Sequence, residues 1–194
     1  MLEVVFTGCP RSGTKYIHKL MCFNNVMIGH EVFFGMPGVG TIVDNMTGDS
    51  SWLAVPYLKE LKKNNTKIIH IVRNPIKVVN SLMVNNIFVK KDLSNIFLEY
   101  AFPRIKNYQG IDKYIYFYIK WNEEIGKYAD KRFRIEDVTK NPVPLFEYIG
   151  EEYFRKYKDV KCNSRVNKII FTKKDINKSQ FKKEFKAMMK KYGY

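Results

Sequence analysis

The chain has 194 residues, of which 45% are hydrophobic and 15% aromatic, and this composition excludes an intrinsically disordered chain. Its 34 Lys and Arg residues outnumber its 19 Asp and Glu residues, which gives a formal net charge of +15. A surface of this charge attracts anions such as phosphorylated cofactors, acidic sugars, nucleic acid or anionic lipid, but the charge does not choose among them.

The cysteines and histidines show no pattern typical of a disulfide framework or a metal site. Cys9, Cys22 and Cys162 are odd in number and fit no zinc-binding spacing, and the three histidines are scattered. We therefore expect no bound metal. Because no apolar run approaches the ~20 residues of a membrane span and Glu3 interrupts any signal peptide, we also expect a cytoplasmic protein with no membrane partner.

The first part of the chain alternates between strand and helix patterns. The β-branched run Leu2–Thr7 predicts a buried strand that ends at a glycine. After a compact loop at 8–13, apolar residues at helical spacing predict a helix over Thr14–Phe23, and a short strand follows over Val26–Gly29. The glycine-rich stretch 31–50 is expected to be a loop, and loops of this length are often functional.

The same alternation continues through the middle of the chain. Ser50 or Ser51 is a plausible N-cap for a helix that runs to about residue 63. Lys67–Val72 is apolar nearly throughout, which is typical of a parallel strand covered on both faces. Pro75 at the first helical position, after an asparagine N-cap, then predicts the start of another helix.

The second half of the chain contains mostly helical patterns. The remaining predicted elements are helices at Asp92–Tyr100 and Asp112–Tyr128, a strand at Lys131–Ile135 and an amphipathic helix at Asn177–Tyr192. Strands that alternate with helices predict an α/β fold with a mainly parallel central sheet flanked by helices. We expect a single domain over residues 1–194, with a motif-bearing core at 2–138 and a helical C-terminal segment at 139–194.

Residues 8–16, Gly-Cys-Pro-Arg-Ser-Gly-Thr-Lys-Tyr, follow the first predicted strand and open the first predicted helix. In this position backbone N–H groups and the positive end of the helix dipole point at the same spot, which is typical of a loop that binds phosphate or sulfate. Gly8 and Gly13 permit close approach of the backbone and positive φ angles. A plain strand-to-helix turn is the alternative interpretation.

The spacing of Gly8 and Gly13 is that of the nucleotide-binding P-loop, G-x-x-x-x-G-K-[ST]. The next residues are Thr14 and Lys15, so the lysine comes one position late and no hydroxyl follows it to bind Mg²⁺. Arg73 follows the strand predicted at 67–72, where a kinase-like protein would more often have a metal-binding aspartate. The loop therefore favours an anion that is handled without a metal.

The run Pro10-Arg11-Ser12-Gly13-Thr14 resembles the P-[KR]-S-G-T loop of sulfotransferases, which binds the 5′-phosphosulfate of 3′-phosphoadenosine 5′-phosphosulfate (PAPS). The second element of that family is a strand ending in Arg with Ser eight positions later, and Arg73 and Ser81 match it. Residues 134–138, Arg-Ile-Glu-Asp-Val, are similar to a strand end common in the family. The resemblance covers roughly residues 2–138 and implies a three-layer, P-loop-like α/β fold.

The resemblance also implies roles for the loop residues. Arg11 matches the residue that contacts the transferring sulfuryl group and the leaving phosphate. Ser12, Gly13 and Thr14 match the residues whose amides and hydroxyls wrap the 5′-phosphate. Lys15 stands where many members have a second threonine, so one hydroxyl contact is lost and a cation is gained.

The remaining cofactor contacts lie outside the loop. In the family, the residues that Arg73 and Ser81 match bind the 3′-phosphate. A guanidinium group suits this role, because it can donate two parallel hydrogen bonds to phosphate oxygens. Tyr16 aligns with an aromatic residue that stacks on adenine in some members, although a helix residue packed on the sheet is equally consistent. The full set of predicted cofactor-binding residues is Pro10, Arg11, Ser12, Gly13, Thr14, Lys15, Tyr16, Arg73 and Ser81.

The acceptor hydroxyl needs a base, which is a histidine in a K-x-H setting in some members of the family and a glutamate in others. The chain has no matching K-x-H motif. His30 and Glu31 follow the strand predicted at 26–29, at the carboxyl edge of the sheet, where ligands bind in open α/β folds. We predict Glu31 as the base and His30 as the alternative, while a solvated loop acid or a partner for Arg11 remains another interpretation of Glu31.

The predicted function is transfer of a sulfuryl group from PAPS to a hydroxyl or amine of a carbohydrate or small molecule, with Arg11, Glu31 and His30 as candidate catalytic residues. The expected partners are PAPS and the acceptor, and not nucleic acid. Two other functions stay open. One is a P-loop kinase or nucleotide phosphotransferase, and the other is a non-catalytic module that binds anions through the basic surface.

Overall fold

The computed structural model describes residues 2–34, 46–88, 98–154, 157 and 168–194. Contacts within the chain divide it into two compact units. The first consists of Met1–Arg73 and Glu124–Arg165, and the second of Asn74–Glu123 and Val166–Tyr194. That the two units form the one domain expected for residues 1–194 stays a prediction.

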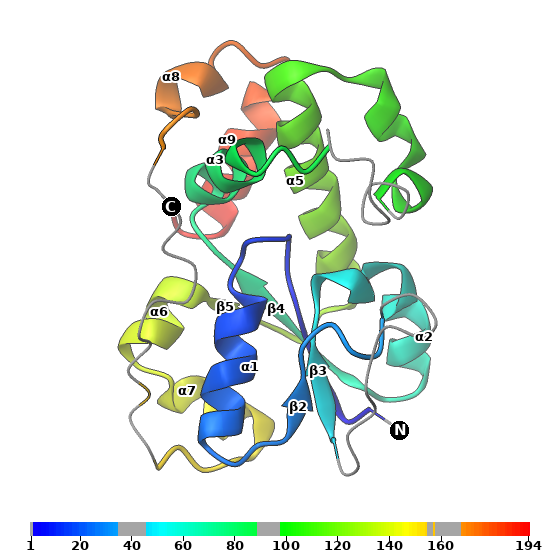
Figure 1. Cartoon of the computed structure of the whole chain (residues 1–194), viewed down its shortest axis with the longest axis vertical. Coiled ribbons are helices and arrows are strands. Elements are labelled where there is room, and N and C mark those ends of the chain that lie inside the picture. Colours follow the sequence, from blue (N-terminus) through cyan, green and yellow to red (C-terminus); the bar gives the residue numbers. More distant parts are fainter. Residues whose placement is uncertain (1, 35–45, 89–97, 155–156, 158–167) are drawn as a thin grey trace. The chain divides into compact units, whose positions relative to one another are not determined.

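The first unit is built on a parallel sheet of five strands in the order β2-β3-β1-β4-β5 (Figure 1). Each pair of neighbouring strands runs parallel. The strands are β1 (Val4–Thr7), β2 (Ile28–Gly29), β3 (Gly48–Ser50), β4 (Lys67–Val72) and β5 (Lys131–Arg134). The α/β fold with a parallel sheet flanked by helices, expected from the sequence, is therefore confirmed.

The helices of the first unit follow the strands in the chain, as parallel connections require. They are α1 (Thr14–Phe23), the short 3₁₀ helix η1 (Trp52–Tyr57), α2 (Leu58–Lys63), α6 (Ile135–Lys140) and α7 (Val143–Ile149). Ser51 is the N-cap of η1, because its Oγ accepts a hydrogen bond from Leu53 N at 3.1 Å. The helix predicted to follow Ser50 or Ser51 thus begins as a 3₁₀ helix and continues as α2.

One face of the sheet packs against α1, α6 and α7 (Figure 1). Alternate residues of β1 and β4 point to this face, because side chains alternate along a strand. The buried side chains that form this core include Val4, Phe6, Ile17, Leu20, Met21, Ile69, Ile71, Val138, Leu145 and Phe146. Burial of each large apolar side chain contributes ~1.5–3 kcal/mol, so this face is a main source of the unit's stability.

β3 lies inside the stretch 31–50 that was expected to be a loop. That expectation is wrong for Gly48–Ser50, which pair with β1 on one side and β2 on the other. The glycine is required by this packing, since a Cβ atom at Gly48 would stand 2.5 Å from the carbonyl oxygen of Val4. Residues 35–45 of the expected loop lie outside the described residues.

The second unit is helical in its described residues. Its elements are α3 (Pro75–Val84), the 3₁₀ helix η2 (Pro103–Asn107), the first part of α5 (Gly110–Tyr128), α8 (Lys173–Ile176) and α9 (Lys182–Lys191). Asn74 caps α3 as expected, accepting a hydrogen bond from Lys77 N at 3.2 Å. Most of the helix predicted at Asp92–Tyr100 lies outside the described residues.

The predicted C-terminal helix Asn177–Tyr192 begins later than expected. Its described counterpart α9 starts at Lys182, because residues 177–181 form turns between α8 and α9. The buried Phe185 of α9 contacts the ring of Tyr118 on α5 and that of Phe171. None of the helices in the described ranges is long and apolar enough to cross a membrane.

Two substitutions on α7 test the importance of the core. Leu145 is fully buried, whereas Val143 on the same helix is 37% exposed. We expect Leu145→Ala to lower the free energy of unfolding by ~2–5 kcal/mol, because it leaves a cavity in the core. The matched control Val143→Ala should change it by less than ~0.5 kcal/mol. Urea titrations of both variants give the comparison, and equal losses would contradict the packing.

Candidate active site

The loop between β1 and α1 forms a tight turn with two residues in left-handed conformations. Arg11 and Gly13 both adopt left-handed conformations, with φ angles of 75° and 110°. Ser12 N donates a hydrogen bond to Cys9 O at 2.9 Å, which closes the turn. A left-handed residue among right-handed neighbours turns successive N–H groups toward one point, and such a nest binds anions.

Two glycines allow this loop to lie directly against its neighbours. A Cβ atom at Gly8 would stand 2.3 Å from the carbonyl oxygen of Ile71 on β4. A Cβ atom at Gly13 would stand 2.7 Å from Cγ1 of Ile135 at the start of α6. No side chain fits at either position, so the close approach predicted for Gly8 and Gly13 is present in the fold.

The loop also buries a hydroxyl whose hydrogen-bonding capacity is unused. Ser12 is 1% exposed, and its Oγ has no hydrogen-bond partner within the described part of the chain. Thr7 Oγ1, at the end of β1, is buried in the same way. A buried hydroxyl without a partner costs ~1–3 kcal/mol, which an oxyanion seated in the loop would offset.

The helix that follows contributes its N-terminus to the same place. α1 starts at Thr14, directly after the left-handed Gly13, and among the described residues no side chain caps its first N–H groups. Its first turn contains no acidic residue, while the exposed Lys15 adds a positive charge. Thr14 is buried, and its carbonyl oxygen accepts a hydrogen bond from Ser50 Oγ at 2.8 Å, which fixes the start of the helix to β3.

Arg73 lies against this loop although it is 62 residues away in the sequence. Its Nη1 donates a hydrogen bond to the carbonyl oxygen of Arg11 at 3.0 Å. The contact follows from the topology, since β4 is the neighbour of β1 and Arg73 comes directly after β4. Ser81 lies on α3, in the second unit. A joint role for Arg73 and Ser81 at one phosphate stays a prediction.

The other predicted loop residues differ in their surroundings. Pro10 is buried at the start of the turn. Tyr16 packs on the core face of the sheet, and its ring centroid lies 5.7 Å from that of Tyr157. This position agrees with the structural interpretation of Tyr16, and a contact with adenine stays a prediction.

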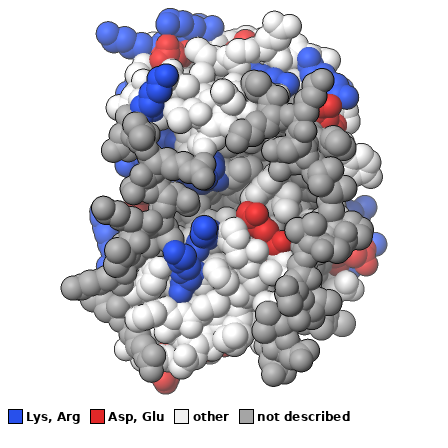
Figure 2. Space-filling view, in the orientation of Figure 1, with Lys and Arg blue, Asp and Glu red and all other residues white. Residues whose placement is uncertain are grey.

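On the face drawn in Figure 2, Lys and Arg side chains are more abundant than Asp and Glu side chains, in line with the net charge of +15.

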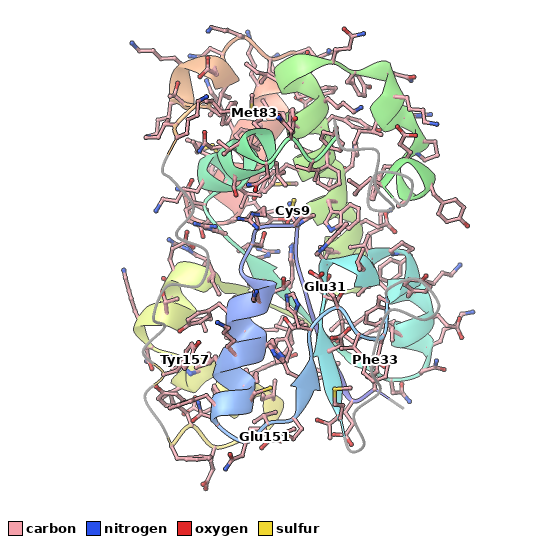
Figure 3. The ribbon with its side chains drawn as sticks, viewed as in Figure 1. Cys9, Glu31, Phe33, Met83, Glu151 and Tyr157 are labelled. Atoms are coloured by element: carbon pink, nitrogen blue, oxygen red, sulfur yellow. The ribbon has the colours of Figure 1, made fainter. Side chains whose placement is uncertain are left out.

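His30 and Glu31 follow β2, at the carboxyl end of the sheet. Figure 3 labels Glu31. Glu31 has a φ angle of 60°, a left-handed conformation that a residue with a side chain adopts only when its surroundings hold it there. The two side chains are close, with 3.7 Å between His30 Nε2 and Glu31 Oε1. The structure therefore brings both predicted candidates for the base together in one turn.

The surroundings shift the pKa values of these two groups in opposite directions. Burial lowers the pKa of His30 to about 4, helped by the positive charges of His18 and Lys15. Burial also raises the pKa of Glu31, and the nearby carboxylate of Asp49 raises it further. A hydrogen bond with Trp52 and the charge of Lys15 oppose that rise. At neutral pH, His30 is thus held uncharged beside a carboxylate of increased basicity.

Asp49 is a residue that the sequence analysis missed. It lies in the middle of β3 and is fully buried. Its Oδ2 accepts a hydrogen bond from Phe33 N at 3.3 Å, and burial raises its pKa. The only signal in the sequence was an acidic residue next to the serines expected to cap a helix. Without a predicted strand at 48–50, nothing placed this residue beside Glu31.

His18 and Cys22 form a second polar pair behind the same turn. His18 Nδ1 lies 3.0 Å from the carbonyl oxygen of Ile28 and 3.7 Å from Cys22 Sγ. The hydrogen bond between them raises the pKa of His18 and lowers that of Cys22. Cys9 differs, because complete burial raises the pKa of its thiol well above the usual value, which makes it a poor nucleophile. Within the ranges that the structure describes, no group of three His, Cys, Asp or Glu side chains is arranged to hold a metal ion.

Comparisons with known proteins identify the fold. No family model matches the sequence, and no curated protein matches it. The structure is similar to the crystal structure of a sulfotransferase from Alicyclobacillus acidocaldarius, with a TM-score of 0.53 and 13% sequence identity over 84% of this chain and 87% of that chain. The chain thus has a sulfotransferase-like α/β fold, and the resemblance stated from the sequence is confirmed at the level of the fold.

The depressed pKa of His30 leads to a testable prediction. We expect the His30 ring to titrate near pH 4 and the His18 ring above the usual histidine value, as measured by NMR of the ring C–H groups. The unfolded chain binds more protons than the folded one between pH 6.5 and about 4, so His30 removes stability as the pH falls through this window. His30→Gln should lack this contribution, and a His30 midpoint near 6.5 would contradict the described burial.

Proposed function

We propose that this protein transfers a sulfuryl group from PAPS to a hydroxyl or amine of a carbohydrate or small-molecule acceptor. The observation that carries the proposal is the loop between β1 and α1. It combines the sequence Pro10-Arg11-Ser12-Gly13-Thr14 with left-handed residues at 11 and 13, the conformation from which anion-binding nests are built, in a fold similar to that of a sulfotransferase. The hydrogen bond that brings Arg73 onto this loop adds a second cation at the same place.

The loop supplies what a sulfuryl transfer requires of the protein. The acceptor oxygen attacks sulfur in line with the bond that breaks, and negative charge develops on the phosphate oxygen that leaves. In this proposal Arg11, the loop N–H groups and the N-terminus of α1 stabilise this charge, and a loop that is already formed does so without the cost of reorganisation. Most of the catalysis then comes from holding the two reactants in line.

Glu31 is the better of the two candidate bases. A base must take a proton from the acceptor as the new bond forms, so greater basicity favours the transfer. Burial and Asp49 raise the pKa of Glu31, whereas the pKa of His30 falls to about 4. Glu31 therefore binds a proton more strongly than His30 does. We assign Glu31 as the base. His30 is an uncharged neighbour that adds no positive charge beside it at neutral pH.

Nucleotide binding tests the proposal and the role of Arg73. We expect calorimetry to show tighter binding of 3′,5′-adenosine diphosphate (PAP) than of adenosine 5′-phosphate (AMP), in the presence of EDTA. Arg73→Ala should weaken PAP binding about tenfold or more, since a charged hydrogen bond is worth ~1.5–3 kcal/mol. Binding of AMP should change much less, because AMP lacks the 3′-phosphate.

Three outcomes distinguish recognition of the 3′-phosphate from damage to the loop, and a sulfotransferase from a kinase. Arg73 also donates to Arg11 O, so equal losses for PAP and AMP would show that the substitution damages the loop and that Arg73 does not recognise the 3′-phosphate. Binding of ATP with Mg²⁺ in preference to PAP would contradict the proposal and favour a kinase. Transfer of ³⁵S from labelled PAPS to members of a panel of sugars and phenols, in EDTA, would support it directly.

The role of Glu31 is tested by an isosteric substitution. We expect Glu31→Gln to reduce kcat ~10²–10⁴-fold, the usual effect of losing a positioned base, with little change in the Kd of PAP. Glutamine keeps the size of the side chain but takes no proton at neutral pH. His30→Ala is the control in the same turn and should retain most of the activity. If His30→Ala is inactive while Glu31→Gln is active, the base is His30.

A further inference from the structure

Asp49 is a fully buried carboxylate, which is an unusual residue for the middle of a strand. It is fully buried in the middle of β3, and its Oδ1 has no hydrogen-bond partner among the described residues. Its side chain points to the same face of the sheet as that of Val5, its partner in the neighbouring strand. That face is opposite to the one that packs against α1. A buried carboxylate with an unused oxygen is costly, so its position calls for a reason.

The contacts of Asp49 connect it to the turn that carries Glu31. Oδ2 accepts the hydrogen bond from Phe33 N at 3.3 Å, two residues after Glu31. Oδ1 lies over Gly29, the last residue of β2, where a Cβ atom would stand 2.8 Å from it. Glycine at 29 therefore leaves the space that the carboxylate occupies. The two oxygens of Asp49 lie against both ends of the segment from Gly29 to Phe33.

This segment needs such an anchor. Glu31 has a left-handed backbone, which costs a residue with a side chain of the order of 1–3 kcal/mol unless its surroundings hold it. On one side, Trp52 of η1 makes a hydrogen bond with the Glu31 side chain. On the other side, Asp49 holds the backbone. The negative charge of Asp49 is also close enough to act on the Glu31 carboxyl.

We propose that Asp49 is a positioning residue for Glu31: its buried carboxylate anchors the turn that carries Glu31 and places a second negative charge beside it. This inference rests on the proposed function, in which Glu31 takes the proton of the acceptor. A nearby negative charge disfavours the ionised form of a carboxyl group, so the charge of Asp49 increases the basicity of Glu31.

The other charged groups around this pair limit the effect without removing it. Lys15 of α1 stabilises the ionised form of Glu31, and His18 of α1 does the same for Asp49. His30, in the same turn as Glu31, stays uncharged above about pH 4 and adds no positive charge at neutral pH. Among the residues that the structure describes, Asp49 is the only one whose charge raises the pKa of Glu31.

Asp49→Asn separates the charge from the anchor. The asparagine oxygen can still accept the hydrogen bond from Phe33 N, and its NH₂ group takes the place of Oδ1, which has no partner among the described residues. Asp130→Asn is the matched control, since Asp130 accepts a hydrogen bond from Ile68 N on β4, three strands from β2 in the sheet. Asp49→Ala removes both the charge and the anchor.

The decisive measurement is the carboxyl titration of Glu31 by ¹³C NMR, with the signal assigned through its loss in Glu31→Gln. We expect the midpoint of Glu31 to move to lower pH in Asp49→Asn and to stay in place in Asp130→Asn. A midpoint that does not move in Asp49→Asn would overturn the proposal. This readout needs no turnover, so it decides the question even if labelled PAPS transfers no sulfuryl group, which would instead contradict the proposed function.

Kinetic measurements test whether Asp49 anchors the turn that carries Glu31. We expect Asp49→Ala to lower kcat about 10- to 100-fold, as small displacements of a catalytic group do, with the Kd of PAP unchanged. In Asp49→Asn the rise of kcat with pH should begin at lower pH than in the unmodified protein. Because Asp49 acts through Glu31, Asp49→Ala should cause no further loss in the Glu31→Gln background. Equal losses in both backgrounds would show a general structural role and overturn the proposal.

Discussion

The backbone contact between Gly8 and β4 determines where the candidate site forms. The chain leaves β1 so close to the neighbouring strand that a Cβ atom at Gly8 would stand 2.3 Å from the carbonyl oxygen of Ile71. This contact keeps the loop over the carboxyl end of the sheet, where α1 then begins. Arg73 leaves β4 at the same edge, and its hydrogen bond to Arg11 O follows from that adjacency. An anion site at this edge needs no further element of the first unit.

The electrostatics of the site divide into a positive and a negative part. The proposed positive part consists of the loop, the N-terminus of α1, Arg11 and Arg73, which donates a hydrogen bond to the Arg11 carbonyl oxygen. The turn after β2 supplies the carboxylate of Glu31 and β3 supplies that of Asp49, and burial raises the pKa of both. The cationic groups and the carboxylates thus come from separate strands of one sheet. The proposed transfer would use this separation, because its two substrates need different chemistry.

The similarity to a solved sulfotransferase shows how little sequence the fold requires. At 13% identity the two chains share an arrangement of strands and helices over most of their lengths. In this chain the fold depends on glycines at close contacts and on the apolar faces of β1 and β4, where substitution has a cost in packing.

The sequence by itself determined the elements whose signals are local. α1 and β4 occupy the predicted ranges, Thr14–Phe23 and Lys67–Val72, because their apolar periodicity and the residues that end them lie within the elements. The loop between β1 and α1 was predicted for the same reason, since its glycines and the helix start lie within a few residues of one another, while its binding of an anion stays a prediction. Asn74 and Pro75 likewise fixed the start of α3 through capping, which involves only neighbouring residues.

Tertiary structure decided the features that depend on distant partners. Gly48–Ser50 has no apolar pattern, and it is a strand only because β1 and β2 supply hydrogen bonds on its two sides. The burial of Asp49, its contact with the turn at Phe33 and its effect on Glu31 all follow from that pairing. A sequence shows which groups are available, whereas the environment that shifts their proton affinity exists only once separate strands lie side by side.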